Sequence, residues 1–78
     1  MLFEYTASSI SEVLAELQRQ YNVVIQYPEN MDYYYTGDVD LNRDFETSLN
    51  LVCRPFEITF EKISEGVYKL NKNPDKNN

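Results

Sequence analysis

The chain has 78 residues, enough for one small domain, and its content of 42% apolar and 26% charged residues is ordinary for a folded globular protein. Thirteen acidic residues against seven Lys and Arg give a net charge of −6, and the basic residues are scattered along the chain. Because phosphate-backbone binding needs clustered cations, these features argue against nucleic acid and anionic membrane surfaces as partners.

The first segment, residues 2–6, predicts a strand with Phe3 and Tyr5 on one face. A helix is predicted over residues 10–20, and Ser9 followed by Glu12 has the spacing of a capping box at its start. Its apolar stripe has the spacing of one helical face and consists of Ile10, Val13, Leu14, Leu17 and Tyr21.

Two further strands are predicted before the second helix. In residues 23–27 the apolar side chains of Val23, Ile25 and Tyr27 alternate with residues expected to face solvent. Residues 33–40 are rich in aromatic and β-branched side chains, which favours a strand. Gly37 lies inside this segment, where a glycine often marks a bulge or close packing.

The last third of the chain predicts a helix and a hairpin. Asp44 can cap the helix, and Pro55 should end it near Cys53. Strands around residues 58–60 and 67–70 are joined by a turn that contains Gly66. We expect one domain over residues 1–70 and a disordered polar tail over residues 71–78. The predicted apolar stripe of the helix is Phe45, Leu49, Val52, Cys53 and Phe56.

The chain also aligns with itself when it is displaced by 35 residues. Such an alignment can arise by chance, because any two amphipathic helices followed by strands align roughly. This match, however, has no gap and includes both helical and strand spacing. It predicts an α+β fold of two β-α-β repeats plus a C-terminal strand, in the order β-α-β-β-α-β-β. The aligned pairs are Ser9 with Asp44, Ile10 with Phe45, Leu14 with Leu49, Leu17 with Val52, Tyr21 with Phe56, Val23 with Ile58, and Ile25 with Phe60.

Together, these segments resemble the C-terminal domain of FecR-type anti-sigma factors. The resemblance covers residues 2–5, 10–17 and 21–25, and it continues through Thr36-Gly37, the second helix and the closing strand. Two departures are Asn22, where the family commonly has glycine, and Ser48, where it usually has an apolar residue. The family is similar to the short N-terminal (STN) signalling domain of secretins and TonB-dependent transducers, which implies two helices packed with small sheets.

The resemblance implies a periplasmic signalling domain of an inner-membrane-anchored regulator. Its partner would be the signalling domain of a TonB-dependent outer-membrane transducer, and other parts of the full-length protein would contact an extracytoplasmic-function sigma factor. No apolar run approaches the roughly 20 residues of a membrane-spanning helix, and the N-terminus has no signal-peptide pattern. The sequence thus belongs either to a cytoplasmic protein or, as the resemblance implies, to a domain excised from a longer chain.

No residue pattern in the chain predicts catalysis, a cofactor or a metal site. Histidine, the commonest general base and metal ligand, is absent from the sequence. Cys53 lies on an apolar stripe, which is typical of an inert core thiol. The aspartates between residues 32 and 44 lack the EF-hand spacing, and Gly37 and Gly66 are too few for a phosphate-binding loop. We therefore expect a non-enzymatic domain.

Three adjacent tyrosines, Tyr33, Tyr34 and Tyr35, are the most suggestive local feature. Since side chains alternate between the faces of a strand, one or two should be buried and at least one exposed. Tyrosine is enriched at interface hot spots, although the three rings could simply cover a small core. Our candidate protein interface comprises these tyrosines and Val39.

Two other functions are compatible with the sequence. One is an STN domain of a TonB-dependent transporter or secretin, which would share the fold but not the regulatory role. The other is a small ferredoxin-like ligand-binding domain, which would require a pocket with converging polar groups. Sequence outside these 78 residues would separate the first from the anti-sigma hypothesis.

Overall fold

A computed structural model describes residues 2–72, and over this range it confirms the predicted element order β-α-β-β-α-β-β. A short 3-10 helix, η1, continues the second helix and was not predicted. The elements are β1 (Leu2–Ser9), α1 (Ile10–Tyr21), β2 (Val24–Gln26), β3 (Tyr34–Asp40), α2 (Phe45–Cys53), η1 (Arg54–Phe56), β4 (Ile58–Ser64) and β5 (Val67–Lys72).

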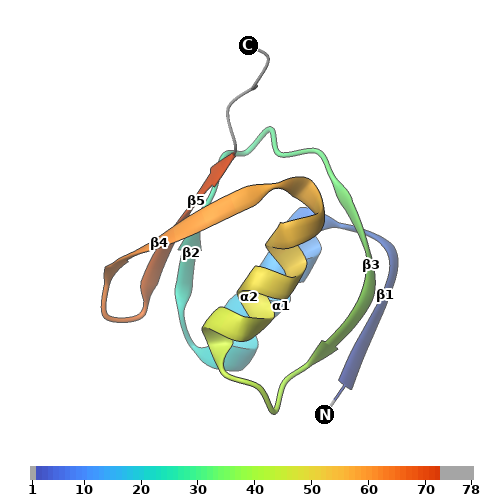
Figure 1. Cartoon of the computed structure of the whole chain (residues 1–78), viewed down its shortest axis with the longest axis horizontal. Helices are drawn as coiled ribbons and strands as arrows, with labels where there is room; N and C mark the ends of the chain where they lie inside the picture. Colours follow the sequence, from blue (N-terminus) through green and yellow to red (C-terminus); the bar gives the residue numbers. More distant parts are fainter. Residues whose placement is uncertain (1, 73–78) are drawn as a thin grey trace.

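The two helices lie between two small sheets (Figure 1). One sheet is the antiparallel pair β1–β3, and the other has the order β2-β5-β4, with β5 parallel to β2 and antiparallel to β4. This arrangement confirms the α+β class. It contradicts the ferredoxin-like alternative, in which one continuous sheet would carry both helices on the same face.

A single apolar core lies between the helices and the two sheets. Of the side chains on the two predicted helix stripes, Ile10, Leu14, Leu17, Leu49 and Val52 are at most 1% exposed. Phe56 differs from the prediction, because η1 turns it to the edge of the core, where it is only partly buried. The buried apolar residues are Ile10, Val13, Leu14, Leu17, Ile25, Tyr35, Val39, Phe45, Leu49, Val52, Cys53, Ile58, Tyr68 and Leu70.

The internal repeat is visible in the backbone as well as in the side chains. Asn22 ends α1 with a left-handed backbone at φ 56°, and Glu57, at the matching position after η1, has φ 58°. Asparagine tolerates the left-handed region better than most residues, and glycine adopts it without steric cost. This conformation explains why asparagine can stand where the family commonly has glycine.

The predicted capping box at the start of α1 is wrong. Ser9 occupies the N-cap position, but its hydroxyl lies 2.8 Å from that of Ser11 and does not cap the helix. Ser9 instead continues the ladder with Tyr34, and the Ile10 amide donates to the carbonyl of Tyr33 at 2.9 Å. The carbonyl of Tyr33, just before β3, thus satisfies the first amide of the helix, and no side chain caps it.

Asp44 caps α2 as predicted. Its carboxylate accepts a hydrogen bond from the Thr47 hydroxyl at 2.6 Å and another from the Thr47 amide at 3.2 Å. These bonds, the hydroxyl first, hold the pKa of Asp44 below its ordinary value. The start of α2 is therefore fixed by local chemistry, as the sequence indicated.

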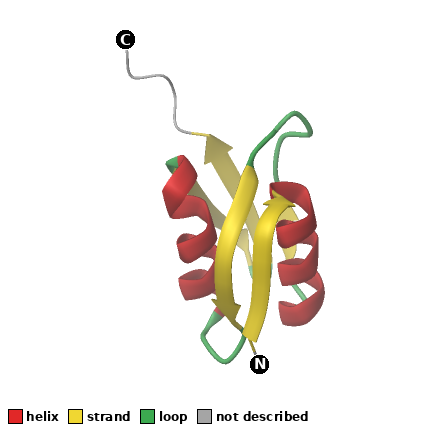
Figure 2. Ribbon diagram, turned by 90° about the vertical axis from the view of Figure 1, so that its right-hand side faces the viewer, coloured by secondary structure: helices red, strands yellow, loops and turns green. Residues whose placement is uncertain are grey.

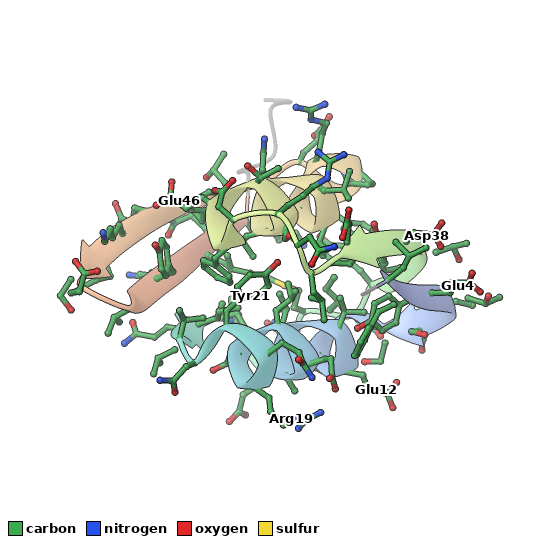
Figure 3. The ribbon with its side chains drawn as sticks, turned by 90° about the horizontal axis from the view of Figure 1, so that it is seen from below. Glu4, Glu12, Arg19, Tyr21, Asp38 and Glu46 are labelled. Carbon is green, nitrogen blue, oxygen red and sulfur yellow. The ribbon has the colours of Figure 1, made fainter. Side chains whose placement is uncertain are left out.

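Ser48, the polar residue on the inner face of α2, has a partner across the core. It is 1% exposed, and its hydroxyl lies 2.9 Å from the hydroxyl of Tyr21, which also donates to the carbonyl of Arg43 at 2.8 Å. Figure 3 shows Tyr21 between the two helices. A buried hydroxyl costs little when it is hydrogen-bonded, so the departure at Ser48 does not disrupt the helix interface.

Most strand ends differ from the predictions by one to three residues, and β4 ends at Ser64, four residues past the predicted limit at Phe60. β1 extends to Ser9, because a bulge of Thr6 and Ala7 opposite Thr36 lets the pairing continue after Tyr5. β5 runs two residues past the predicted limit at Leu70. The predicted disorder of residues 73–78 lies outside the described residues.

Cys53 is buried as predicted, with 1% of its surface exposed. Burial raises the pKa of its thiol to about 12. A neutral thiol in the core is a poor nucleophile, which agrees with a packing role.

Candidate protein interface

The structure separates the three adjacent tyrosines. Tyr34 is 63% exposed and Tyr35 is 4% exposed, so consecutive side chains of β3 take opposite faces as the sequence indicated. Tyr33 precedes the strand and is partly buried. Val39, the fourth predicted interface residue, is completely buried. Tyr34 is therefore the member of the predicted set that presents most of its side chain to a partner.

Tyr33 contacts residues of both repeats. Its ring stacks on Phe56 with 4.8 Å between centroids and 11° between planes, and the Lys72 ammonium lies 5.5 Å from its centroid. Its carbonyl also accepts the hydrogen bond from Ile10 at the start of α1. These contacts give Tyr33 a structural role independent of any partner.

Tyr35 belongs to the core side of the β1–β3 sheet. Its ring packs edge-on against Tyr5 with a centroid distance of 6.1 Å. Burial, assisted by the nearby charge of Asp38, raises the pKa of the Tyr35 hydroxyl. Gly37 makes room for this hydroxyl, because a Cβ placed there would lie 2.9 Å from the oxygen. The predicted special role of Gly37 is thus close packing, and the bulge lies in β1 instead.

The outer face of the β1–β3 sheet combines one large aromatic ring with acidic side chains. Along β3, Tyr34, Thr36 and Asp38 are exposed. Asp38 pairs in register with Glu4 of β1, and both side chains point away from the core in Figure 3. Two carboxylates at opposing positions make this face locally negative.

The helices lie behind the two-stranded sheet. Figure 2 shows α2 on the β3 side and α1 on the β1 side. In the other sheet, Gln18 of α1 accepts a hydrogen bond from the Ile25 amide at 3.1 Å, which covers part of the β2 edge. β5 is the central strand, and the longer edge strand of that sheet is β4. The exposed side chains of β3 make the outer face of its sheet a candidate contact surface.

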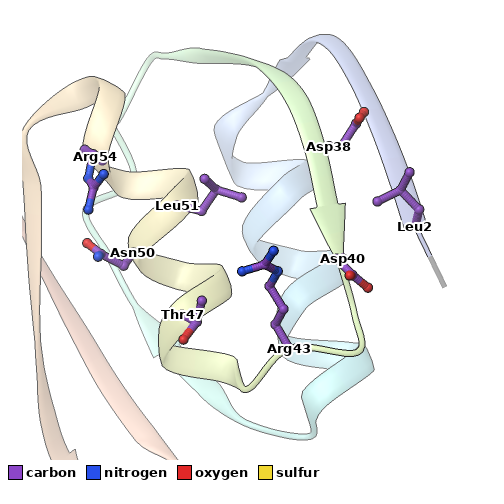
Figure 4. A pocket seen from close by; sticks show the side chains of 8 residues that line it. All are labelled: Leu2, Asp38, Asp40, Arg43, Thr47, Asn50, Leu51 and Arg54. Carbon is purple, nitrogen blue, oxygen red and sulfur yellow. The ribbon is translucent and has the colours of Figure 1, made fainter.

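Sequence reasoning missed a groove of about 410 Å³ between α2 and the β1–β3 sheet (Figure 4). Four of its residues have the i, i+3, i+4, i+7 spacing of a helix face, and they lie on the side of α2 opposite to its buried stripe. That spacing was visible in the sequence, but it carries only one apolar residue and so gave no apolar signal. The groove is lined by Leu2, Asp38, Asp40, Arg43, Thr47, Asn50, Leu51 and Arg54.

The groove has one basic and one acidic wall. Arg43 and Arg54 lie on the helix side, while Asp38 and Asp40 lie on the sheet side. Within residues 2–72 the ion pairs closer than 4.0 Å are Arg19–Glu16 and Lys62–Glu65, so neither groove arginine is neutralised at that range. The four charges are available to a partner.

Two further observations on the described residues concern metal binding and membrane crossing. In residues 2–72 no group of three or more His, Cys, Asp or Glu side chains could hold a metal ion. None of the helices in that range has the length and apolar character needed to cross a membrane.

Comparison with known proteins places these surfaces in context. A family described as "FecR, C-terminal" matches residues 2–69. Two crystal structures, at 1.65 and 2.50 Å, of a proposed anti-sigma factor from Parabacteroides distasonis ATCC 8503 superpose with TM-scores of 0.79 and 0.76. Their sequence identities are 30% and 28%, and each match covers 92% of this chain and 34% of the other. The chain thus spans about a third of the length of these relatives. No curated protein matches it.

Proposed function

The chain belongs to the FecR C-terminal family, and on that premise we propose that it is a signalling domain of a membrane-anchored anti-sigma factor, which acts by protein contact and not by catalysis. The likeness to a proposed anti-sigma factor supports this role. So does the chemistry of the chain, because histidine is absent and the Cys53 thiol is buried with a raised pKa. The domain offers surfaces and no evident catalytic constellation.

The proposed partner is the signalling domain of a TonB-dependent outer-membrane transducer, met in the periplasm. Contact with that domain would shift the population of states of the attached anti-sigma region, and other parts of the full-length protein would hold the sigma factor. A ligand can shift such an equilibrium only by its difference in affinity for the two states, so the contact must be specific. The proposal needs a distinct recognition surface on this domain.

The observation that carries the proposal is the outward face of the β1–β3 sheet. Tyr34 exposes 63% of its surface there, although a tyrosine on a small domain can be buried against the core, as Tyr35 is. A large exposed ring on a face that also carries the charged side chains of Glu4 and Asp38 has the composition of an interface anchor on a polar surface. We infer that Tyr34 contacts the transducer domain and that Tyr33, Tyr35 and Val39 support its position from within.

Replacing Tyr34 with alanine should weaken binding of the cognate transducer signalling domain by about 5- to 150-fold, the range of an interface anchor. The fold should be retained, because the ring is mostly exposed. The measurement is calorimetric titration of the transducer domain into the parent and the variant, with circular dichroism to check folding.

Ile63→Ala is the matched control, since Ile63 is 50% exposed but lies on β4, in the other sheet. Ile63→Ala should bind the transducer domain with the same affinity as the parent. An affinity unchanged by Tyr34→Ala and reduced by Ile63→Ala would move the interface to the hairpin of β4 and β5. Lack of any binding by the folded parent would refute the partner itself.

A further inference from the structure

We propose that the groove between α2 and the β1–β3 sheet binds a segment of the transducer signalling domain that presents an apolar side chain between a carboxylate and a basic group. This inference rests on the proposed function and adds a second contact site to the one at Tyr34. It also specifies the chemistry of the partner segment, which the exposed ring alone does not.

Two exposed leucines supply the apolar part of the site. Leu51 is 45% exposed and points from α2 toward β3, and Leu2 is 54% exposed at the position of β1 that pairs with Asp40 (Figure 4). Both line the same groove, one from each wall. β3 passes between the two leucines in Figure 4, so a partner segment lying across β3 would bury apolar surface of both, which is worth roughly 25 cal/mol per Å² before the costs of association.

α2 and the residues at its two ends distribute side chains along the groove. Thr47 and Leu51 lie one turn apart on the outer face of α2. Arg54 follows the helix in η1, and Arg43 precedes it at the other end. The arginines therefore lie at opposite ends of the apolar part of the groove. At about 1.5 Å of rise per helical residue, Leu51 lies roughly 5 Å along the axis from Arg54.

The charges determine which segment fits. A carboxylate on the partner would meet Arg43 or Arg54 on the helix wall, and arginine binds carboxylates well because its planar group can donate two parallel hydrogen bonds. A lysine or arginine on the partner would meet Asp38 and Asp40 on the opposite wall. A segment with its charges reversed would place like charges together on both walls, so the groove discriminates orientation as well as partner.

The arginine pair offers the groove a local attraction that the net charge of the domain does not. The net charge is −6, so the long-range field of the domain repels acidic partners, yet two of its seven basic residues line one groove without an ion pair inside 4.0 Å within the described chain. Two long cationic side chains held beside an exposed leucine are suited to short-range recognition of a carboxylate, which general attraction by the domain would not provide.

The test is titration of the purified cognate transducer signalling domain into the parent, Leu51→Ala, Arg54→Glu and Arg19→Glu. Arg19→Glu is the matched control, because it changes the net charge as much as Arg54→Glu but lies on α1, outside the groove. We expect Leu51→Ala to weaken binding about 5-fold or more and Arg54→Glu about 10-fold or more. Arg19→Glu should stay within about 2-fold of the parent, since an exposed charge outside the contact acts only through a screened field.

Ionic strength provides a second measurement. Between 50 and 300 mM NaCl the affinity of the parent should fall, and that of Arg54→Glu should fall less, because the attraction screened by salt has been removed. Suppose the parent binds the transducer domain. If Arg54→Glu and Arg19→Glu then bind it with equal affinity, or if Leu51→Ala binds it as tightly as the parent, the groove is not the binding site, while the proposed function stands. No binding by the folded parent would overturn the proposed function and this inference with it.

Discussion

Replacing Leu14 or Leu49 with alanine is expected to lower the free energy of unfolding by about 2–5 kcal/mol, a large share of the roughly 5–15 kcal/mol that stabilises a typical domain. Both side chains are completely buried, one on each helix, in the core that the two sheets enclose. Truncation loses the transfer free energy of the removed methyl groups and leaves a cavity that the rigid surroundings only partly fill.

The control for this experiment lies on the same helix as Leu49. Leu51 is 45% exposed, so Leu51→Ala removes the same atoms from a position that faces solvent and should cost well under about 1 kcal/mol. Denaturant and thermal unfolding curves of the three variants would measure the difference. Melting temperatures of Leu14→Ala and Leu49→Ala within a degree of the parent would show that the core has been assigned to the wrong residues.

Substitution of Gly37 with alanine should also destabilise the domain strongly for its size, by about 1–3 kcal/mol from backbone strain with a steric contribution added to it. Gly37 has φ 153°, a conformation that residues with a side chain rarely adopt. Its new Cβ would lie 2.9 Å from the Tyr35 hydroxyl oxygen and 3.1 Å from the adjacent ring carbon. Tyr35 is buried and cannot easily move away.

Gly66→Ala separates the two contributions. Gly66 also has a positive φ, of 77°, but a Cβ there would have no neighbour within 4 Å. Its alanine variant should therefore show backbone strain alone and lose less stability than Gly37→Ala. Adding Tyr35→Phe to Gly37→Ala removes the closest atom and should recover part of the loss. Equal unfolding free energies for Gly37→Ala and Gly66→Ala would contradict the close packing of Gly37 on Tyr35.

Much of the fold was predictable because its main signals are periodic. The helix stripe around Leu14 and the alternation around Ile25 each repeat with one geometry over several residues, and the displacement by 35 residues joins them into two similar units. The structural features that the sequence did not reveal depend on contacts between the two repeats. The Ser9 hydroxyl lies against that of Ser11 and does not cap α1, while the Ile10 amide donates to the carbonyl of Tyr33, a partner distant in the chain.

The interface was less predictable than the fold for a related reason. Alternation along β3 correctly indicated that adjacent tyrosines would separate, but only the packing of η1 explains why Tyr33 is stacked on Phe56 and Tyr34 is left exposed. The groove depends on residues from β1, β3 and α2 that meet only in the folded chain. A short helix with one exposed leucine, Leu51, gives no amphipathic signal on its outer face.

The most direct test of the central claim is to map the contact on the isotope-labelled domain by nuclear magnetic resonance while the cognate transducer signalling domain is added. We predict that the amide signals of β1, β3 and the outer face of α2, including Tyr34 and Leu51, change with saturation, and that those of β4 and β5 remain in place. Changes confined to the hairpin of β4 and β5, or no change at saturating concentrations of the transducer domain, would contradict the account.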